Sequence, residues 1–265
     1  MKRSAEESVA PKKLKLTESS ISPYFETKRL SDDFFNVPCF DLAKNLLGTV
    51  LVRELENGTI LKAVIVETES YPGNEDKASY SFNGRRTPRN EPMYMKPGTA
   101  FVYKTYGMYH CFNISSGGDG AAVLLRSAEP TVGIEHMNYN RLTYHQKRRN
   151  KSGGENQLAY DQTKVLKSHE LCNGPSKLCI SLDITAENCN KADLCTSDCI
   201  WIEKGPKVIS EEDVVSSTRI GIESAGAEWA NKLYRFYISN NSSVSILDKK
   251  KKSNTKVTKR SREIR

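Results

Sequence analysis

VIVETESYPGNEDKASYSFNGRRTPRN, residues 64–90, decides the fold, because it runs from the interior of a strand straight into charged residues. Residues 64–66 are apolar and β-branched, the composition of a strand in the middle of a sheet. Glu67, Glu69 and Tyr71 follow at every second position, so in a strand their side chains share one face. The sequence therefore predicts a central strand whose end presents two carboxylates and an aromatic ring.

A second apolar run, residues 121–125, predicts another buried strand, and it ends in Arg126. An arginine in such a place must be paired, because an unpaired buried charge is very costly. Glu67 and Glu69 end the other buried strand and are its natural partners. The arrangement is as consistent with a structural ion pair as with a reaction centre, and this pattern alone favours neither.

The surrounding segments predict one compact α+β domain, built on a largely antiparallel, curved β-sheet with surrounding helices. One helix is expected after Asp41 as N-cap and ends at Gly48, and another begins at Pro175. The polar residues 138–168 are predicted to form a surface loop. The expected strands are residues 49–53, 60–67, 100–105, 108–115, 121–126, 218–224 and 233–239.

The ends of the chain differ from its middle. The net charge is +8 over 265 residues, and much of the excess lies in the tails. Residues 1–28, which include PKKLKL, and residues 249–265 are predicted to be disordered basic tails around a domain of residues 29–248. The tails are either merely solubilising or serve nuclear targeting and attraction to a polyanion, and we favour the second interpretation.

This interpretation predicts a nuclear protein, with mitochondria as a second location. No apolar run approaches the ~20 residues of a membrane span, so no membrane contact is expected. The seven cysteines form no metal-ligand pattern, because Cys195 and Cys199 are not joined by a Cys-x-x-Cys pair or a neighbouring histidine. We therefore expect reduced thiols and no metal.

Three tyrosines, Tyr103, Tyr106 and Tyr109, lie on one predicted hairpin whose turn is Tyr106-Gly107. Core aromatic side chains point inward from mid-strand, whereas a tyrosine at a turn points toward a partner. Exposed rings beside basic residues are typical of proteins that stack on bases or wedge between them. The hairpin is therefore predicted to protrude and to intercalate between the bases of a nucleic acid.

The loop NGRRTPRN, residues 83–90, supplies groups that suit phosphate oxygens, and the helix start near residue 176 offers a second anion position. The alternative for the loop is an ordinary solvated turn. Together with the hairpin, these residues favour an enzyme that acts on nucleic acid. The predicted nucleic-acid contacts in these segments are Arg85, Arg86, Thr87, Arg89, Ser176 and Lys177.

Four blocks of sequence carry a family resemblance: VETESYPGNEDKASYS, RRTPRN, KPGTAFVYKTYGMYHCFNISSGGDGAAVLLRSAEP and ELCNGPSKLC. From about residue 31 to residue 248 the chain resembles the 3-methyladenine (alkyladenine) DNA glycosylase family of higher organisms. The resemblance implies a monomeric, single-domain enzyme that flips a damaged purine out of duplex DNA and hydrolyses its N-glycosidic bond. The implied lesions are 3-methyladenine, 7-methylguanine, hypoxanthine and ethenoadenine, and no metal or organic cofactor is implied.

The resemblance also implies a catalytic centre of three groups. Glu69 matches the family's catalytic acid, a general base for a water that attacks C1′ from the face opposite the base. Arg126 matches the arginine that helps to hold this water, and the backbone carbonyl of Ile220 falls at a third contact to it.

A pocket for the flipped purine is implied as well. Tyr71 and Tyr103 match its aromatic walls, and Asn113 matches a floor residue that excludes the exocyclic amino group of guanine. The carbonyl of Ala78 falls where it can accept a proton from purine N7. Tyr80 stands where the family commonly has histidine, so it keeps an aromatic face and one hydroxyl but loses titration near neutral pH. The alternatives are core rings for Tyr71 and Tyr103 and a satisfied buried amide for Asn113.

On the hairpin, Tyr106 matches the side chain that fills the vacated stack, and Met108 and Tyr109 lie beside it on the same wedge. Two other functions stay open. A bifunctional glycosylase/lyase would need a lysine, for which Lys177 is the candidate. A binding protein for damaged DNA would need no Glu69–Arg126 pair.

A further motif precedes the domain. Glu18, Ile21, Tyr24 and Phe25 fall at the spacing of the sliding-clamp binding motif Gln-x-x-aliphatic-x-x-aromatic-aromatic, with glutamate in place of the usual glutamine. The favoured alternative is a first strand that docks on the domain. Clamp binding is the less favoured expectation.

Overall fold

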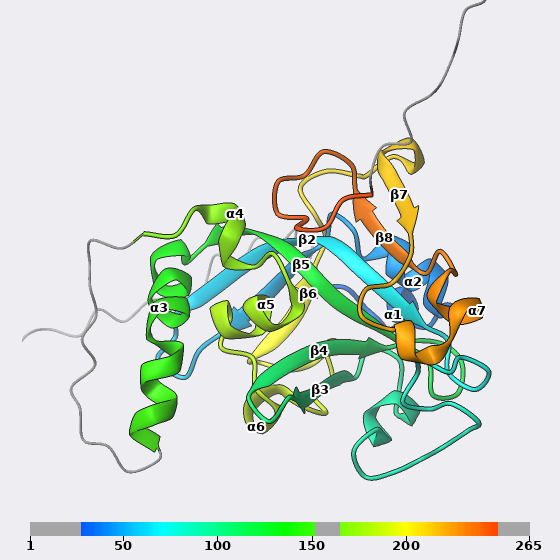
Figure 1. The fold of residues 1–265 in the computed structure, drawn as a ribbon. Helices are drawn as coiled ribbons and strands as arrows, with labels where there is room; N and C mark the ends of the chain where they lie inside the picture. The colour runs from blue at the N-terminus through cyan, green and yellow to red at the C-terminus, as the bar shows by residue number, and fades with distance from the viewer. Residues whose placement is uncertain (1–27, 152–164, 249–265) are drawn as a thin grey trace, which may run out of the picture.

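In the computed structural model of the protein, the described residues are 28–151 and 165–248, with only the backbone described for residues 145–151. Within them, eight strands form one antiparallel sheet in the order β3-β4-β5-β2-β1-β6, and β8 pairs with both β2 and β7 (Figure 1). This confirms the predicted α+β class. The strands are β1 Val50–Glu54, β2 Ile60–Tyr71, β3 Ala100–Thr105, β4 Tyr109–Ser115, β5 Ala122–Val132, β6 Ile200–Glu203, β7 Val214–Ser217 and β8 Arg235–Ile238.

Helices surround this curved sheet, and all except α3 are short (Figure 1). The α-helices are α1 Asp32–Phe35, α2 Cys39–Asn45, α3 Ile134–Lys151, α4 Ser168–Leu171, α5 Pro175–Ser181, α6 Ala186–Cys189 and α7 Ala227–Ala230. Three 3₁₀ turns are η1 Glu91–Tyr94, η2 Glu211–Asp213 and η3 Glu223–Ala225.

Alternate side chains of strand β2 point to opposite faces of the sheet, and one of these faces packs against α2. The Thr68 and Ser70 hydroxyls donate to the carbonyls of Ala43 and Cys39 in α2, at 2.8 and 3.1 Å. The apolar residues of α2 and α5 belong to one continuous hydrophobic core. Because strand side chains alternate, the odd-numbered residues 67–71 face away from α2. The side chains of Glu67, Glu69 and Tyr71 therefore lie on the face of the sheet opposite α2.

The predicted hairpin is formed by β3 and β4. Thr105 pairs with Tyr109, and the Met108 N–H donates to the Thr105 carbonyl at 3.1 Å. Tyr106 and Gly107 have φ of +49° and +65°, the positive values that a two-residue hairpin turn requires. A bulky aromatic residue rarely adopts such a φ, so Tyr106 is held in a strained conformation.

Two predicted strand ends are wrong. Strand β2 extends to Tyr71 and β5 extends to Val132, so Glu67 and Arg126 lie inside strands rather than at their ends. The pairing of β2 with β5 shifts register on both sides of Glu67. The strands continue past these charges because the charges find partners within the sheet.

The predicted loop 138–168 is wrong over its first part, because residues 134–151 form α3. Met137 reaches the core, and the Asn140 side-chain amide donates to the Ser181 carbonyl at 3.1 Å. The helix is therefore anchored partly through polar groups, which hides it from a search for an apolar stripe.

Residues 218–224 are not the predicted strand. The Arg219 side chain turns inward to Asp76, the Ile220 N–H donates to Glu69, and Gly221 has a φ of +75°. The Arg219 side chain and the Ile220 N–H in this segment therefore bond to buried carboxylates, and the segment pairs with none of the described strands.

The two predicted helix starts differ in outcome. Helix α5 begins at Pro175, as expected. Helix α2 begins at Cys39, with Pro38 at the N-cap, so the prediction of Asp41 as N-cap is wrong. Asp41 lies in the first turn, where a carboxylate interacts favourably with the helix dipole.

Three predictions fall outside the described residues: the PKKLKL cluster, the motif of Glu18, Ile21, Tyr24 and Phe25, and the basic residues 249–265. In the part of the chain that is described, no helix has both the length and the apolar character needed to cross a bilayer.

Candidate active site

Glu69 is enclosed by donors, and its side chain has no exposed surface. Oε1 accepts from the Ile220 N–H at 2.8 Å and lies 3.2 Å from Arg126 Nη1. Oε2 accepts from the Tyr71 hydroxyl at 2.8 Å. These donors come from three separate parts of the chain, and together they fix the carboxylate in one orientation.

The Ile220 contact differs from the one that the family resemblance implied. The group that reaches Glu69 is the Ile220 amide N–H. A contact from the Ile220 carbonyl to a water stays a prediction.

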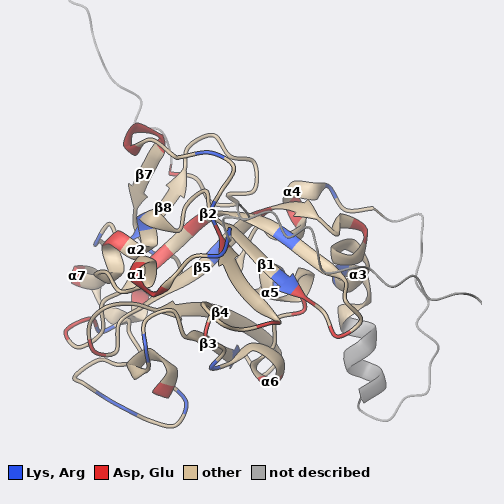
Figure 2. Cartoon of the chain, turned by 180° about the vertical axis from the view of Figure 1, so that it is seen from behind, with Lys and Arg blue, Asp and Glu red and all other residues tan. Residues whose placement is uncertain are grey.

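Arg126 also pairs with Glu67, which leads into a second buried network. Arg126 Nε donates to Glu67 Oε1 at 3.2 Å, and Arg235 Nη1 donates to the same oxygen at 2.8 Å. Ser127 Oγ donates to Glu67 Oε2 at 2.7 Å. Seen from behind, acidic positions of β2 lie beside basic positions of β5 and β8 (Figure 2). Glu67 therefore holds Arg126 in place while Arg126 contacts Glu69.

Tyr71 links Glu69 to a buried ion pair. Burial and the charge of Glu69 raise the pKa of the Tyr71 phenol well above its ordinary value, so the hydroxyl stays protonated and donates. The Arg219 guanidinium lies over the Tyr71 ring, 4.6 Å from its centroid. Asp76 pairs with Arg219 and also accepts the Ala78 N–H at 3.1 Å, which fixes the loop that carries Ala78.

Tyr103 belongs to an aromatic cluster on the hairpin. Its ring meets Tyr80 edge-on at 4.8 Å and lies 5.1 Å from Phe101. Burial, more than any neighbour, raises the pKa of the Tyr103 phenol, and Cys111, Tyr80 and Tyr71 add to the shift. Asn113 is buried, and its side-chain amide donates to the Phe101 carbonyl at 3.1 Å.

The wedge residues are firmly supported at their base. Tyr109 stacks on Tyr144 of α3 at 6.0 Å, and the Tyr144 hydroxyl donates to the Met108 carbonyl. Tyr106 at the tip is 87% exposed. A strained, exposed aromatic on a well-packed support has no role in packing, which indicates a role toward a partner.

Part of the basic loop is used internally. Arg86 makes a two-pronged contact with Glu91 at 2.6 and 2.9 Å, and the Thr87 hydroxyl donates to Asn90 at 2.9 Å. Arg85 is exposed. Of these three predicted phosphate contacts, Arg86 and Thr87 already stabilise the loop itself.

Arg89 connects the loop to the aromatic cluster. It donates to the Lys104 carbonyl at 2.9 Å and to the Tyr80 hydroxyl at 3.3 Å. Its guanidinium lies 5.0 Å from the Tyr80 centroid and 5.3 Å from that of Tyr103. Arg89 therefore supports the position where the family commonly has histidine.

Ser176 and Lys177 lie in the first turn of α5 and are half-buried. Lys177 Nζ donates to Asn173 Oδ1 at 2.8 Å. Burial and the nearby Arg141 lower the pKa of the Lys177 ammonium.

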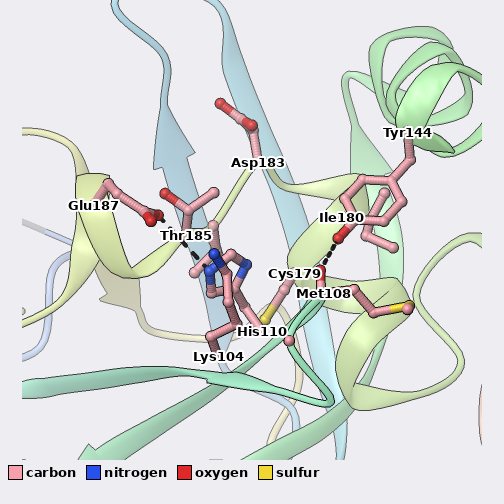
Figure 3. A pocket seen from close by; sticks show the side chains of 11 residues that line it. Lys104, Met108, His110, Tyr144, Cys179, Ile180, Asp183, Thr185 and Glu187 are labelled. Carbon is pink, nitrogen blue, oxygen red and sulfur yellow. Dashed lines mark hydrogen bonds and ion pairs between the residues drawn. The ribbon is translucent and has the colours of Figure 1, made fainter. Parts of the chain in front are cut away.

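A cavity of about 440 Å³ lies behind the hairpin, with Met108, His110 and Ile180 in its wall. His110 faces Glu187 (Figure 3). His110 neighbours Cys111, the register partner of Tyr103, and alternate strand residues point to opposite faces. The hairpin therefore separates this cavity from the face that carries Tyr103.

One group of three potential metal ligands lies together in the described residues: Asp32, Asp193 and Cys195. Lys96 Nζ lies 2.6 Å from Asp32 and 3.0 Å from Asp193. The Lys96 ammonium therefore already bridges these two carboxylates.

Sequence reasoning missed three charged residues of the site: Asp76, Arg219 and Arg235. Both arginines stand among apolar residues, in TRIGI and LYRFYI. An arginine inside an apolar run must be buried with a partner, the argument that was applied to Arg126 and that extends to these two.

Comparisons with known proteins identify the chain. The profile of the methylpurine-DNA glycosylase family matches residues 33–242. A DNA-3-methyladenine glycosylase of Homo sapiens is 47% identical over 228 residues, which cover 86% of this chain and 72% of that protein. A probable DNA-3-methyladenine glycosylase of Encephalitozoon cuniculi is 43% identical over 220 residues, which cover 83% and 94%.

The fold and the site thus belong to an enzyme of the hydrolase class, one that acts on N-glycosyl bonds and takes DNA as its substrate. The chain is a member of the methylpurine-DNA glycosylase family.

Proposed function

We propose that this protein is a monofunctional DNA glycosylase that removes alkylated and deaminated purines from duplex DNA by means of a water activated by Glu69. The proposed substrates are 3-methyladenine, 7-methylguanine, hypoxanthine and ethenoadenine. The observation that carries the proposal is the geometry of Glu69, a fully buried carboxylate held by three donors beside tyrosine rings.

The proposed reaction has one chemical step. A water near Glu69 attacks C1′ of the flipped nucleotide, its proton passes to the Glu69 carboxylate, and the C1′–N bond breaks with its electrons leaving on the base. The products are the free base and an abasic site. Arg126, Ile220 and Tyr71 keep the carboxylate from turning away, since each holds one of its oxygens.

Selection would depend on the aromatic walls. Tyr71 and Tyr103 offer ring faces that attract a cationic base such as 3-methyladenine by cation–π contact. Such a base is already a good leaving group. Neutral bases such as hypoxanthine need protonation or a hydrogen bond in addition, for which the carbonyl of Ala78 and the side chain at position 80 are the candidates.

The direct test is incubation of the protein with duplex oligonucleotides that carry one hypoxanthine, ethenoadenine or 7-methylguanine. Release of the base and an alkali-labile abasic site are expected. Borohydride is added in parallel, because an attacking Lys177 amine would form a Schiff base and leave a covalent protein–DNA adduct. Binding without release would instead favour a damage-binding protein.

The wedge gives a first prediction. Tyr106→Ala should slow excision from duplex DNA by about tenfold or more, because the ring no longer replaces the stacking of the flipped base. Single-turnover rates on single-stranded and duplex substrates measure this. Val208→Ala, which also truncates a highly exposed side chain, is the control and should behave as the wild type. Equal losses on both substrates would contradict a wedge role.

A second prediction concerns Tyr80. Tyr80→His should leave 7-methylguanine excision little changed and should raise excision of hypoxanthine or ethenoadenine severalfold, because imidazole offers a ring N–H donor that titrates near neutral pH. Relative rates on the three lesions measure the effect. Tyr80→Phe removes only the hydroxyl that Arg89 contacts and separates loss of that contact from the gain of imidazole. Unchanged relative rates in Tyr80→His would defeat the idea.

A further inference from the structure

A fully buried ion pair lies directly behind the proposed catalytic centre. Arg219 Nη1 and Nη2 lie 2.5 and 2.8 Å from the two carboxylate oxygens of Asp76, and neither side chain has exposed surface. Arg219 Nη1 also donates to the Ser70 carbonyl of β2 at 3.0 Å. The pair therefore joins the loop after β2, β2 itself and the segment before β8.

The surroundings of Arg219 do not favour a large contribution of the Asp76–Arg219 pair to the stability of the fold. Its guanidinium lies between the rings of Tyr71 and Tyr234, at 4.6 and 5.1 Å from their centroids. Its Nε is buried and has no hydrogen-bond partner. A buried pair with an unsatisfied donor is commonly no more stable than apolar residues of the same volume. Another role must explain its position.

That role follows from what Arg219 contacts. The guanidinium packs on Tyr71, whose hydroxyl donates to Glu69 Oε2 at 2.8 Å. The next residue is Ile220, whose N–H donates to Glu69 Oε1 at 2.8 Å. Fixing Arg219 thus fixes two of the three donors that hold Glu69, one through a ring and one through the backbone.

The charge of Arg219 also bears on the substrate. Because Arg219 covers one face of Tyr71, a base that stacks on this ring must use the opposite face. An isolated arginine there would repel a cationic base on the other face of the ring, because the Arg219 guanidinium lies only 4.6 Å from the ring centroid in a buried site. Asp76 cancels that charge at a distance of 2.5 Å.

We propose that the Asp76–Arg219 pair is the positioning element of the catalytic centre, and that neutralisation of Arg219 by Asp76 allows Tyr71 to hold cationic bases. This inference rests on the proposed function. It assigns positioning roles to two residues that touch neither the base nor the attacking water.

The test measures single-turnover excision of 7-methylguanine, which is cationic, and of hypoxanthine, which is neutral, at saturating enzyme. Asp76→Asn keeps the side-chain shape but leaves Arg219 charged, and should lower the ratio of 7-methylguanine to hypoxanthine rates on the order of tenfold. The double variant Asp76→Asn with Arg219→Gln removes both charges. The double variant should restore the wild-type ratio of the two rates. Both rates should nevertheless be on the order of tenfold below those of the wild type, because Tyr71 and Ile220 are no longer held.

Arg53→Lys is the matched control. Arg53 is also buried and lies in β1, and among the described residues its side chain donates to backbone carbonyls alone, including that of Cys199 at 3.1 Å. Per folded molecule, as measured by circular dichroism, this variant should keep both the wild-type rates and their ratio. A purely structural role for Asp76 would likewise leave the ratio unchanged.

The outcomes separate the two proposals. An unchanged ratio in Asp76→Asn, or wild-type rates in the double variant, would overturn the inference while the activity of the wild type stands. No excision by the wild type would overturn the proposed function and this inference with it. If the Asp76 variants do not fold, Tyr234→Leu removes the ring on the far side of Arg219 and should slow both reactions with an unchanged ratio. Full activity of that variant would overturn the inference.

Discussion

Glu69→Gln should reduce excision of every substrate by roughly 10²- to 10⁴-fold, the contribution of a positioned general base. The amide keeps the size of the carboxylate but cannot take a proton from water. Its oxygen can still accept from Arg126 and Ile220, and its NH₂ would then face the Tyr71 hydroxyl, which can rotate to accept. Binding of lesion-containing DNA should therefore survive.

Single-turnover kinetics and a binding titration on the same oligonucleotide measure the two effects separately. Glu129→Gln is the matched control, since Glu129 is an exposed acid of the adjacent strand β5, and its side chain accepts from the Asn241 amide at 2.9 Å. It should excise at the wild-type rate. Near wild-type excision by Glu69→Gln would show that another group is the base.

Glu67→Gln should have the largest effect on stability. Glu67 accepts from Arg126, Arg235 and Ser127, so the substitution removes the negative charge shared by two buried arginines. Breaking a buried ion pair from one side commonly costs about 3–5 kcal/mol. Urea unfolding followed by circular dichroism should show a loss of this size in the free energy of unfolding.

Glu203→Gln is the comparison variant. Glu203 pairs with Lys62 at 2.7 Å, but both side chains are partly exposed, and such a pair contributes at most about 1 kcal/mol. A Glu67 variant that unfolds at the same urea concentration as the Glu203 variant would mean that the Arg126–Glu67–Arg235 network does not stabilise the fold.

The sequence was most informative where local physical rules act. Alternation along β2 placed Glu69 and Tyr71 on one face, and the cost of a buried charge required a partner for Arg126; the structure provides both. The turn at Tyr106-Gly107 followed from the hairpin pattern. Each of these inferences depends only on residues that are neighbours in sequence, or on the expectation that one strand is buried.

What escaped prediction depends on contacts between distant segments. Asp76 sits in a loop whose composition fits any turn, and only the fold brings Arg219 to it. Residues 218–224 alternate like a strand, yet Arg219 and Ile220 serve the site instead of a ladder. The polar composition of residues 138–151 predicts a loop, whereas they belong to α3, which is anchored partly by polar contacts such as that of Asn140 with Ser181.

The buried pairs also determine when the centre is completed during synthesis. The separations along the chain are 168 residues for Glu67 and Arg235, 151 for Glu69 and Ile220, and 143 for Asp76 and Arg219. At ~5–20 residues per second, the acids leave the ribosome roughly 7–34 seconds before their partners. A nascent chain that still lacks Arg219, Ile220 and Arg235 is therefore without the donors that hold Asp76, Glu69 and Glu67, and should release no base until these residues have been made.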